Sequence, residues 1–271
     1  MQRKKVTRTI ENISKRELSI QFSLDGFSFC ISNFKGEKFH FSSYKFPEKL
    51  ASPELILEKI QEIFKSDSDL QDDFESVLVI HENNLSTFVP NRYFKEEALK
   101  DYLKFSVKTI STDYIAYDDL ENQDIKNVYI PYINVNNFLF QNFGSFEYQH
   151  HASVLVEKLL SYTKDDSLHC YVNVSDTLFD MVVIENQKLI FHNTFDFQSK
   201  EDFIYYILFN FEQLKLDPNE NSVIFSGNIH KESDLYKIAY KYIKTVAFLK
   251  AEAFAFDNKE IEDHSNFILL G

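Results

Sequence analysis

The sequence predicts an α/β protein made of two similar lobes, each a βββαβα unit with a mixed sheet, that face each other across a cleft. Its 271 residues are enough for one large α/β domain or two lobes, and strand-like and helix-like segments alternate along them. The pattern of the first half also starts again in the second. SIQFSLDGFSFCI (19–31) aligns with YVNVSDTLFDMVV (171–183), and SVLVI (76–80) aligns with SVIFS (222–226). A three-strand meander and a crossover helix that occur twice indicate a duplicated lobe.

The first lobe begins with a meander. Leu18, Ile20 and Phe22 alternate with polar residues, as in a half-buried strand, and Asp25-Gly26 is a two-residue hairpin signal. Ser52-Pro53 then marks the start of a helix, with Leu55, Ile56, Ile60, Ile63 and Phe64 as its apolar stripe. The expected elements are strands at 18–24, 27–34, 37–46, 76–81 and 128–132, helices after Ser52, at 94–105 and at 133–143, and a loop at 118–126.

The second lobe repeats this order after FEYQHHASVLVEKLLSY (146–162), which indicates a strand that runs into a helix. Ser199 is the expected N-cap of its crossover helix, with acidic residues in the first turn. The expected elements are strands at 169–175, 179–185, 188–197, 222–227 and 246–249, and helices at 199–214 and 232–243. The predicted divisions are a flexible basic N-terminal tail (1–17), a first lobe (18–145), and a second lobe (146–271) with the linking strand and helix and an acidic C-terminal tail.

Charge and composition exclude several classes of function. The net charge of −13 disfavours extended binding to nucleic acid, and the basic group Arg3, Lys4, Lys5 and Arg8 is either a solvated tail or a short contact with an acidic partner. No apolar run approaches the roughly 18 to 20 residues of a membrane span, so direct membrane insertion is not expected. Cys30 and Cys170 lie in apolar strand patterns, which favours buried thiols over a disulfide and a cytoplasmic location.

Glycine is scarce, with five residues where average usage of about 7% would give on the order of nineteen. Enzymes that hold phosphates with backbone N–H groups need glycine for close approach and for positive φ. The chain therefore offers few places for such a phosphate cradle.

Two facing lobes of this kind resemble the actin-like ATPase superfamily, which includes sugar kinases, heat-shock chaperones, and bacterial cell-division and pilus-assembly proteins. Three blocks, IHENNLSTFVPNRYF (80–94), VYIPYINVNNFLFQNFGSFEYQHH (128–151) and HCYVNVSDTLFDMVV (169–183), look like a bacterial family of unknown function with that fold. The resemblance extends from about Leu18 to Leu249 and implies a fold without implying a reaction.

The motifs that serve the superfamily's chemistry are altered here. Both of its phosphate hairpins usually begin Asp-x-Gly, whereas the chain has Gln21-Phe22-Ser23 and Asn173-Val174-Ser175. Amide side chains bring no negative charge to a hard cation, and the serine side chains block the closest backbone approach. The usually glycine-rich adenosine loop is Ser226-Gly227-Asn228. These positions are the expected nucleotide-site residues, without catalytic residues and with weak binding of ATP and Mg²⁺ at most.

The remaining chemical groups have simpler interpretations. Asp25 and Asp176 are expected as turn residues and not as displaced metal ligands. His150 and His151 are adjacent, and neighbours on a strand point to opposite faces, so a metal site is not expected there. No P-loop, dinucleotide fingerprint or nucleophile elbow is present.

Three hypotheses about function follow. The first is an actin-like protein without ATPase activity that acts as a scaffold or regulatory module for an unidentified protein partner. The second is an ATP-binding switch or weak ATPase that uses Ser226, Gly227 and the hairpin N–H groups. The third is a platform for a membrane assembly that is reached through a partner protein.

Overall fold

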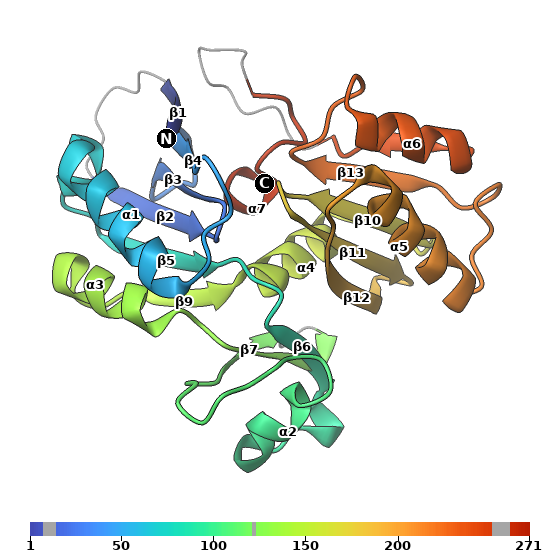
Figure 1. The fold of residues 1–271 in the computed structure, drawn as a ribbon, viewed down its shortest axis with the longest axis horizontal. Coiled ribbons are helices and arrows are strands. Elements are labelled where there is room, and N and C mark those ends of the chain that lie inside the picture. The colour runs from blue at the N-terminus through green and yellow to red at the C-terminus, as the bar shows by residue number, and fades with distance from the viewer. Residues whose placement is uncertain (8–14, 121–122, 251–260) are drawn as a thin grey trace.

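Two lobes lie side by side, with helix α4 between them and a small third sheet below (Figure 1). The computed structural model describes residues 1–7, 15–120, 123–250 and 261–271. Its sheets have six, five and three strands, in the orders β1-β4-β3-β2-β5-β9, β12-β11-β10-β13-β14 and β6-β8-β7. The mixed α/β architecture predicted from the sequence is confirmed.

The first lobe is the six-stranded sheet with its helices. Apolar residues that alternate along β2 and β3 are buried and pack against Ile56, Ile60 and Ile63 of α1. Leu55 was expected in that apolar stripe but is exposed. The elements are β1 (Gln2–Thr7), β2 (Arg16–Phe22), β3 (Gly26–Asn33), β4 (Lys38–Lys45), β5 (Ser76–His81), β9 (Glu147–His150), α1 (Pro53–Ser66) and α3 (Ile133–Phe143).

The second lobe is the five-stranded sheet covered by two helices. Ser199 caps α5 with a capping box, in which its side chain accepts a hydrogen bond from the Asp202 amide and the Asp202 side chain accepts one from the Ser199 amide. The elements are β10 (His169–Val174), β11 (Leu178–Glu185), β12 (Lys188–Asp196), β13 (Val223–Gly227), β14 (Val246–Phe248), α5 (Lys200–Gln213) and α6 (Asp234–Tyr242).

The duplication expected from the sequence is visible in the topology. In each lobe three antiparallel strands are followed by two strands parallel to the first, so the order β4-β3-β2-β5-β9 corresponds to β12-β11-β10-β13-β14. The first hairpin turns also match. The Ser23 amide donates to the Gly26 carbonyl over 3.0 Å, and the Ser175 amide donates to the Leu178 carbonyl over 2.8 Å.

The expectation of a flexible N-terminal tail is wrong for residues 2–7, which form β1 at the edge of the first sheet. Val6 is 1% exposed, and Arg3 and Lys5 make ion pairs with Asp67 and Asp69 over 2.6 and 2.5 Å. One apolar anchor and two ion pairs hold the strand, although the segment's polar composition suggested a solvated end. Arg8, the last member of the basic group, lies outside the described residues.

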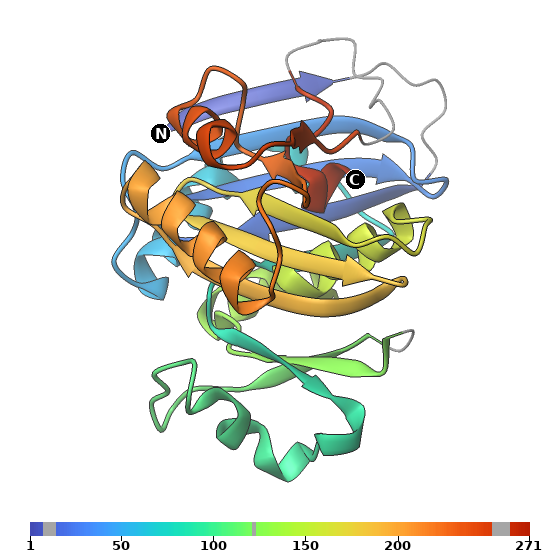
Figure 2. The same ribbon diagram turned by 90° about the vertical axis from the view of Figure 1, so that its right-hand side faces the viewer.

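A small third sheet corrects the expected loop at 118–126. Residues 118–120 and 125–126 of that segment belong to the antiparallel strands β7 (Ala116–Leu120) and β8 (Ile125–Tyr129), and β6 (Ser86–Pro90) pairs with β8. The helix expected at 94–105 is only the short α2 (Leu99–Leu103) after two 3₁₀ turns. Leu120 and Val128 anchor the hairpin in the interior, which offsets the poor strand propensity of its acidic residues. Figure 2 shows this sheet and α2 projecting below the two lobes.

Two further expectations are corrected at the interface between the lobes. Strand β9, assigned to the second lobe from sequence, pairs with β5 of the first, and α4 (His151–Tyr162) then passes between the lobes. Residues 251–260, where much of the expected acidic C-terminal tail falls, lie outside the described residues. The end of the chain is not a tail, because α7 (Phe267–Leu270) is buried against α4 and strands of both lobes. Burial of its four consecutive apolar side chains stabilises this packed position, although acidic residues precede the helix in sequence.

Two sequence-based expectations about the whole chain can be checked in the described residues. Cys30 and Cys170 are both buried and both free thiols, so the preference for thiols over a disulfide is confirmed. None of the helices in the described ranges has the length and apolar character needed to cross a membrane.

Candidate functional site

The ends of the two equivalent hairpins line a cavity of about 340 Å³ between the lobes. The strands β2 and β10 end there, which brings together residues 152 positions apart in sequence. Six of the seven residues expected from sequence line the cavity: Gln21, Ser23, Asn173, Ser175, Gly227 and Asn228. Ser226 is buried, and its hydroxyl donates to the Asn173 side-chain oxygen over 3.0 Å.

Glu82 lies between the two hairpins and was missed by the sequence reasoning. It directly follows β5, and its backbone amide donates to the Phe22 carbonyl over 3.0 Å. Its carboxylate accepts a hydrogen bond from the Gln21 amide group over 2.7 Å and another from the Ser175 hydroxyl. A polar residue at the carboxyl end of a buried parallel strand beside the first hairpin was the signal that could have identified it.

The tips of the hairpins also contact each other across the cavity. The Thr177 hydroxyl donates to the Asp25 carboxylate over 2.6 Å, and Lys45 makes an ion pair with Asp176 over 2.8 Å. Burial raises the pKa of Asp25. The Asp25 amide donates to the Ser23 hydroxyl over 3.0 Å, which is the local turn chemistry expected for this residue. Both aspartates therefore also join the lobes, which the sequence did not indicate.

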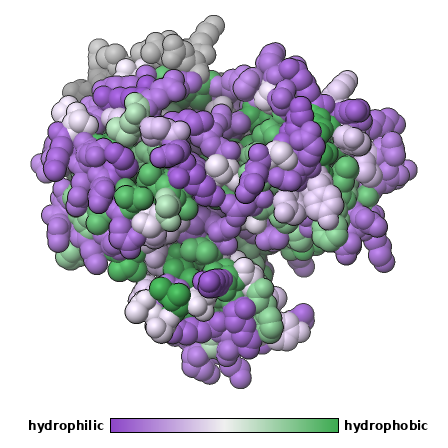
Figure 3. Space-filling view, viewed as in Figure 1, coloured by the Kyte–Doolittle hydropathy of each residue, from purple (hydrophilic) through white to green (hydrophobic). Residues whose placement is uncertain are grey.

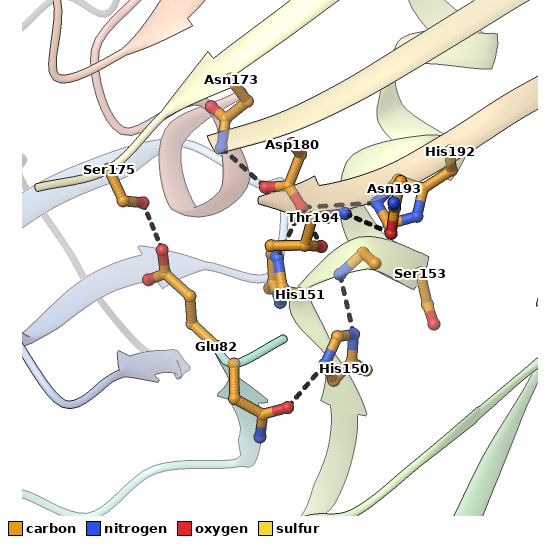
Figure 4. A network of polar contacts seen from close by, with 12 residues as sticks. Glu82, His150, His151, Ser153, Asn173, Ser175, Asp180, His192, Asn193 and Thr194 are labelled. Atoms are coloured by element: carbon orange, nitrogen blue, oxygen red, sulfur yellow. Dashed lines mark hydrogen bonds and ion pairs between the residues drawn. The ribbon is translucent and has the colours of Figure 1, made fainter. Parts of the chain in front are cut away.

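A buried polar network surrounds Asp180, the cross-strand neighbour of Asn173 (Figure 4). The Asp180 carboxylate is 3.0 Å from His151 Nε2 and 3.3 Å from His192 Nε2, and it accepts a hydrogen bond from the Thr194 hydroxyl over 2.7 Å. Burial opposes its ionisation, but the His151 and His192 imidazoles outweigh burial and lower the pKa of Asp180 well below its usual value. Asp180 in turn outweighs the effect of burial on His151 and raises the pKa of that imidazole. The lobe thus holds its carboxylate one strand away from the hairpin position occupied by Asn173.

The reasoning from sequence about His150 and His151 is corrected by their position at the junction of β9 and α4. Since they do not lie within one strand, their rings are neighbours, with centroids 4.5 Å apart. His150 Nε2 is 3.2 Å from the Asn83 side-chain oxygen, and His150 Nδ1 accepts a hydrogen bond from the Ala152 amide over 3.2 Å. Burial lowers the pKa of His150. In the described ranges no group of three or more His, Cys, Asp or Glu side chains is arranged to hold a metal ion.

Gly227 is required by the backbone at the end of β13. Its φ is +85°, and a Cβ atom there would lie 2.2 Å from the Val174 carbonyl oxygen. The next amide, of Asn228, donates to that same oxygen over 2.6 Å, and the Gly227 amide donates to the His264 carbonyl over 2.8 Å. The fold alone therefore accounts for this glycine, whatever the cavity binds.

The sequence as a whole matches one family. Residues 5–246 fit the model of the family described as a protein of unknown function, DUF3822. The chain belongs to the DUF3822 family. This agrees with the resemblance to an uncharacterised family with an actin-like ATPase fold that the sequence blocks indicated. No curated protein is significantly similar to this DUF3822 chain.

Solved structures support the same fold. The DUF3822 chain is similar to a Bacteroides thetaiotaomicron protein with an actin-like ATPase fold and unknown function, with 20% identity and a TM-score of 0.77 over 88% of this chain and 91% of that one. PilM in the PilM-PilN type IV pilus biogenesis complex is 10% identical with a TM-score of 0.58, over 86% and 88% of the two chains. The ethanolamine utilization protein EutJ from Carboxydothermus hydrogenoformans is 7% identical with a TM-score of 0.52, over 90% and 87%. At these identities the likeness shows the actin-like ATPase fold.

Proposed function

We propose that this DUF3822 protein is a non-catalytic, actin-like protein that binds a protein partner. The observation that carries the proposal is the position of Glu82 between the two hairpins. Its carboxylate accepts hydrogen bonds from the Gln21 amide group and the Ser175 hydroxyl. In the superfamily that the sequence resembles, this gap between the hairpins holds the phosphates of ATP. An internal carboxylate now uses the polar groups that would meet those phosphates.

The charges around the cavity support the same conclusion. Three carboxylates line it, those of Asp25, Glu82 and Asp176, with two lysines, Lys4 and Lys45. Lys45 already pairs with Asp176. A nucleoside triphosphate carries several negative charges, and carboxylates within a few ångströms repel them in a partly buried cavity. Gln21 and Asn173, at the positions of the usual aspartates, supply no charge to a Mg²⁺ ion.

Two features support a protein partner. The similar PilM structure was determined in a complex with PilN, so the fold is compatible with a protein-binding role. The described surface also exposes apolar residues among hydrophilic ones, which are green among purple in Figure 3. Its exposed side chains include large aromatic ones. Large examples, all at least 44% exposed, are Tyr93, Phe105, Tyr114, Phe140, Tyr205, Phe209 and Tyr240. Through its partner such a protein also fits a role in a membrane assembly.

The test of the non-catalytic proposal is ATP turnover by the wild-type protein and by a variant with restored motifs. The variant carries Gln21→Asp, Ser23→Gly, Asn173→Asp and Ser175→Gly, with Glu82→Gln to remove the internal carboxylate. We expect no magnesium-dependent turnover from the wild type. Hydrolysis by the wild type at about 1 per second, the low end of ordinary enzymes, would overturn the proposal. The restored variant checks that the assay detects hydrolysis on this scaffold.

An ATP-binding switch is the second candidate, because the six cavity-lining residues named above surround a volume within the usual range of ligand pockets, roughly 300 to 1,000 Å³. Calorimetric titration with ATP, with and without Mg²⁺, separates the two functions. Heat of binding that is lost in Asn228→Leu and retained in the distant control Asn219→Leu would favour the switch. Titrations without heat would support the non-catalytic, partner-binding role.

The proposed binding of a protein partner is tested by a separate measurement. Surface variants Phe105→Ser and Tyr205→Ser leave the core untouched, because both side chains are exposed. Proteins retained by the wild type but not by one of these variants, under matched conditions, would support a partner and locate its surface. Retention that is identical for the wild type and both variants would show that these surfaces are not used.

A further inference from the structure

The turn that follows α2 presents an exposed phenylalanine. Phe105 is 90% exposed, more than any other large apolar side chain in the described ranges, whereas Leu103 and Val107 on either side of it are buried. The Leu103 carbonyl accepts hydrogen bonds from the Ser106 and Val107 amides over 3.0 and 2.8 Å, which closes the turn. Because buried residues fix the turn on both sides, the backbone holds Phe105 toward solvent.

Basic side chains surround this phenylalanine. Lys104 Nζ is 5.1 Å from the centroid of the Phe105 ring. It also pairs with Asp101 over 3.2 Å, but the pair is solvent-exposed and therefore weak. Lys100, one helical turn before Lys104, and Lys108 are exposed as well. Phe105 thus projects between three lysines.

A second pair of a cation and an aromatic ring lies beside the same helix. The Arg92 guanidinium carbon is 4.6 Å from the centroid of the Tyr93 ring, and Tyr93 is 61% exposed. The Tyr102 hydroxyl of α2 donates to the Tyr93 carbonyl over 2.6 Å and accepts from the Lys95 amide over 2.7 Å, which holds this segment against the helix. Residues 92–108 carry five basic and three acidic side chains, in a chain with a net charge of −13. The region around α2 is therefore locally positive.

This combination suits the surface of an anionic bilayer. Aromatic rings enter the boundary between headgroups and acyl chains, while lysine and arginine meet the acidic headgroups. Neither the cavity between the hairpins nor the groove of about 410 Å³ along α3 is lined by any of residues 92–108. A projecting ring outside both hollows fits a fluid lipid surface, which needs no matching pocket, better than it fits a peptide, which needs a groove.

The acidic remainder of the chain does not prevent such a contact. Exposed charges separated by more than the Debye length, about 8 Å at physiological ionic strength, are largely screened from each other. Figure 2 shows α2 at the end of the projection that is farthest from the two lobes. The lobes can therefore stay in solution while the region around α2 touches a membrane.

We propose that the turn after α2 is a peripheral membrane-binding site. Phe105 enters the headgroup boundary of an anionic lipid surface, and Lys100, Lys104 and Lys108 meet its headgroups. One ring and a few lysines give weak, reversible adsorption, which needs no membrane-spanning segment. The inference goes beyond the proposed function and does not rest on it, since it concerns a lipid surface and neither the hairpins nor a protein partner.

The first test is sedimentation of the full-length protein with vesicles of phosphatidylcholine, with or without phosphatidylserine. We expect binding only to the vesicles with phosphatidylserine, strongest at low salt and weaker as salt is added. Phe105→Ser should weaken this binding about tenfold, because the ring no longer leaves water. The matched control is Tyr205→Ser, at an exposed aromatic residue of the second lobe, which should bind like the wild type. Both side chains are exposed, so unchanged melting temperatures are expected for the two variants.

The second test changes charge. Lys100→Gln with Lys108→Gln should weaken binding to the same vesicles about tenfold, since each lysine near the surface contributes to the attraction. Lys237→Gln with Lys241→Gln makes the same change of net charge at exposed positions of α6 and should leave binding unchanged. Equal weakening by the two double variants would mean that only net charge matters, which would overturn the proposed site.

Fluorescence reports the position of the ring directly. The chain contains no tryptophan, so Phe105→Trp introduces a single reporter. We expect its emission to shift to shorter wavelength with phosphatidylserine vesicles and to be quenched by brominated lipid, whereas Tyr205→Trp should show neither effect. Emission of Phe105→Trp that vesicles leave unchanged would contradict entry of this side chain into the lipid.

Two further results would overturn the inference. The wild type would fail to sediment with phosphatidylserine vesicles at low salt, or Phe105→Ser would sediment as well as the wild type. If vesicles do not bind but Phe105→Ser loses a protein that the wild type retains from extract, the turn is a contact for a protein partner instead. ATP turnover, the test of the non-catalytic role, is measured without vesicles, so its outcome and that of the lipid experiments are distinguishable.

Discussion

The Ser175 hydroxyl of the second lobe donates a hydrogen bond to the Glu82 carboxylate, which follows the central parallel strand of the first lobe. Because Glu82 also accepts from Gln21, one carboxylate joins both hairpins. The same residues that the sequence indicated as an altered phosphate site thus form a direct connection between the lobes. Four predictions test this connection and the buried groups around it.

Removal of the Glu82 carboxylate should weaken the contact between the lobes. Glu82→Ala leaves the Gln21 and Ser175 donors without their acceptor, so we expect the free energy of unfolding to fall by about 1 to 3 kcal/mol in urea denaturation. The control is Lys49→Ala, which removes the solvent-exposed interlobe ion pair with Asp196, where a loss of about 0 to 1 kcal/mol is expected. Equal losses in the two variants would contradict a special role of Glu82.

Removal of the Asp180 charge should lower the free energy of unfolding more than removal of the Glu82 carboxylate. Asp180→Asn leaves the buried His151 and His192 imidazoles without their carboxylate, and breaking a buried pair in this way costs about 3 to 5 kcal/mol. The pKa of His151 should drop below its usual value, which a histidine NMR titration would detect. Asp165→Asn, at the exposed pair with His169, should change stability little. An unchanged His151 titration would refute the assignment of its raised pKa to Asp180.

The contribution of the Asp180–His151 pair to stability should depend on pH at both ends. The lowered pKa of Asp180 gives stability that is present above its unfolded pKa of about 3.9 and is lost as the pH falls through the lower folded value. The raised pKa of His151 gives stability that is fully present below about 6.5 and is lost as the pH rises through the higher folded value. The difference in unfolding free energy between the wild type and Asp180→Asn should therefore be largest between about pH 4 and 6.5. A difference that is flat across that range and beyond it would be incompatible with this linkage.

Two glycines with positive φ should respond very differently to alanine. At Gly227 a Cβ would meet the Val174 carbonyl oxygen at 2.2 Å, whereas at Gly36 nothing lies within 4 Å of it. Both variants carry the backbone cost of a positive φ, about 1 to 2 kcal/mol, but only Gly227→Ala adds a clash with the main chain. We expect Gly36→Ala to fold with a loss of about that size and Gly227→Ala to lose clearly more, measured by urea unfolding. Similar losses at both sites would remove the steric explanation for Gly227.

Much of the fold could be predicted because it depends on local patterns. The alternation of Leu18, Ile20 and Phe22 defined β2, and the Ser199 capping box defined the start of α5. The repeat of these patterns gave the duplication and the equivalence of the hairpins. Polar segments were predicted less well, because β1 and the hairpin of β7 and β8 are held by a few buried anchors and ion pairs whose partners are distant in sequence.

The residues of the candidate site also fall into those that local sequence patterns predicted and those that depend on distant contacts. Six of the seven expected residues line one cavity, because they occupy equivalent ends of duplicated strands, and the pairing of those strands follows from the repeat. Glu82 and Asp180 were not predicted, since their significance depends on contacts made across 93 and 29 residues of sequence.

By itself the sequence determined the fold class, the duplication and the replacement of both Asp-x-Gly motifs, because hydrophobic periodicity, turn chemistry and residue identity are local properties of the chain. Only the tertiary structure decided what stands between the hairpins. Hydrogen bonds act over a few ångströms, so the contacts of Glu82 with Gln21 and Ser175 exist only once the two lobes are packed together.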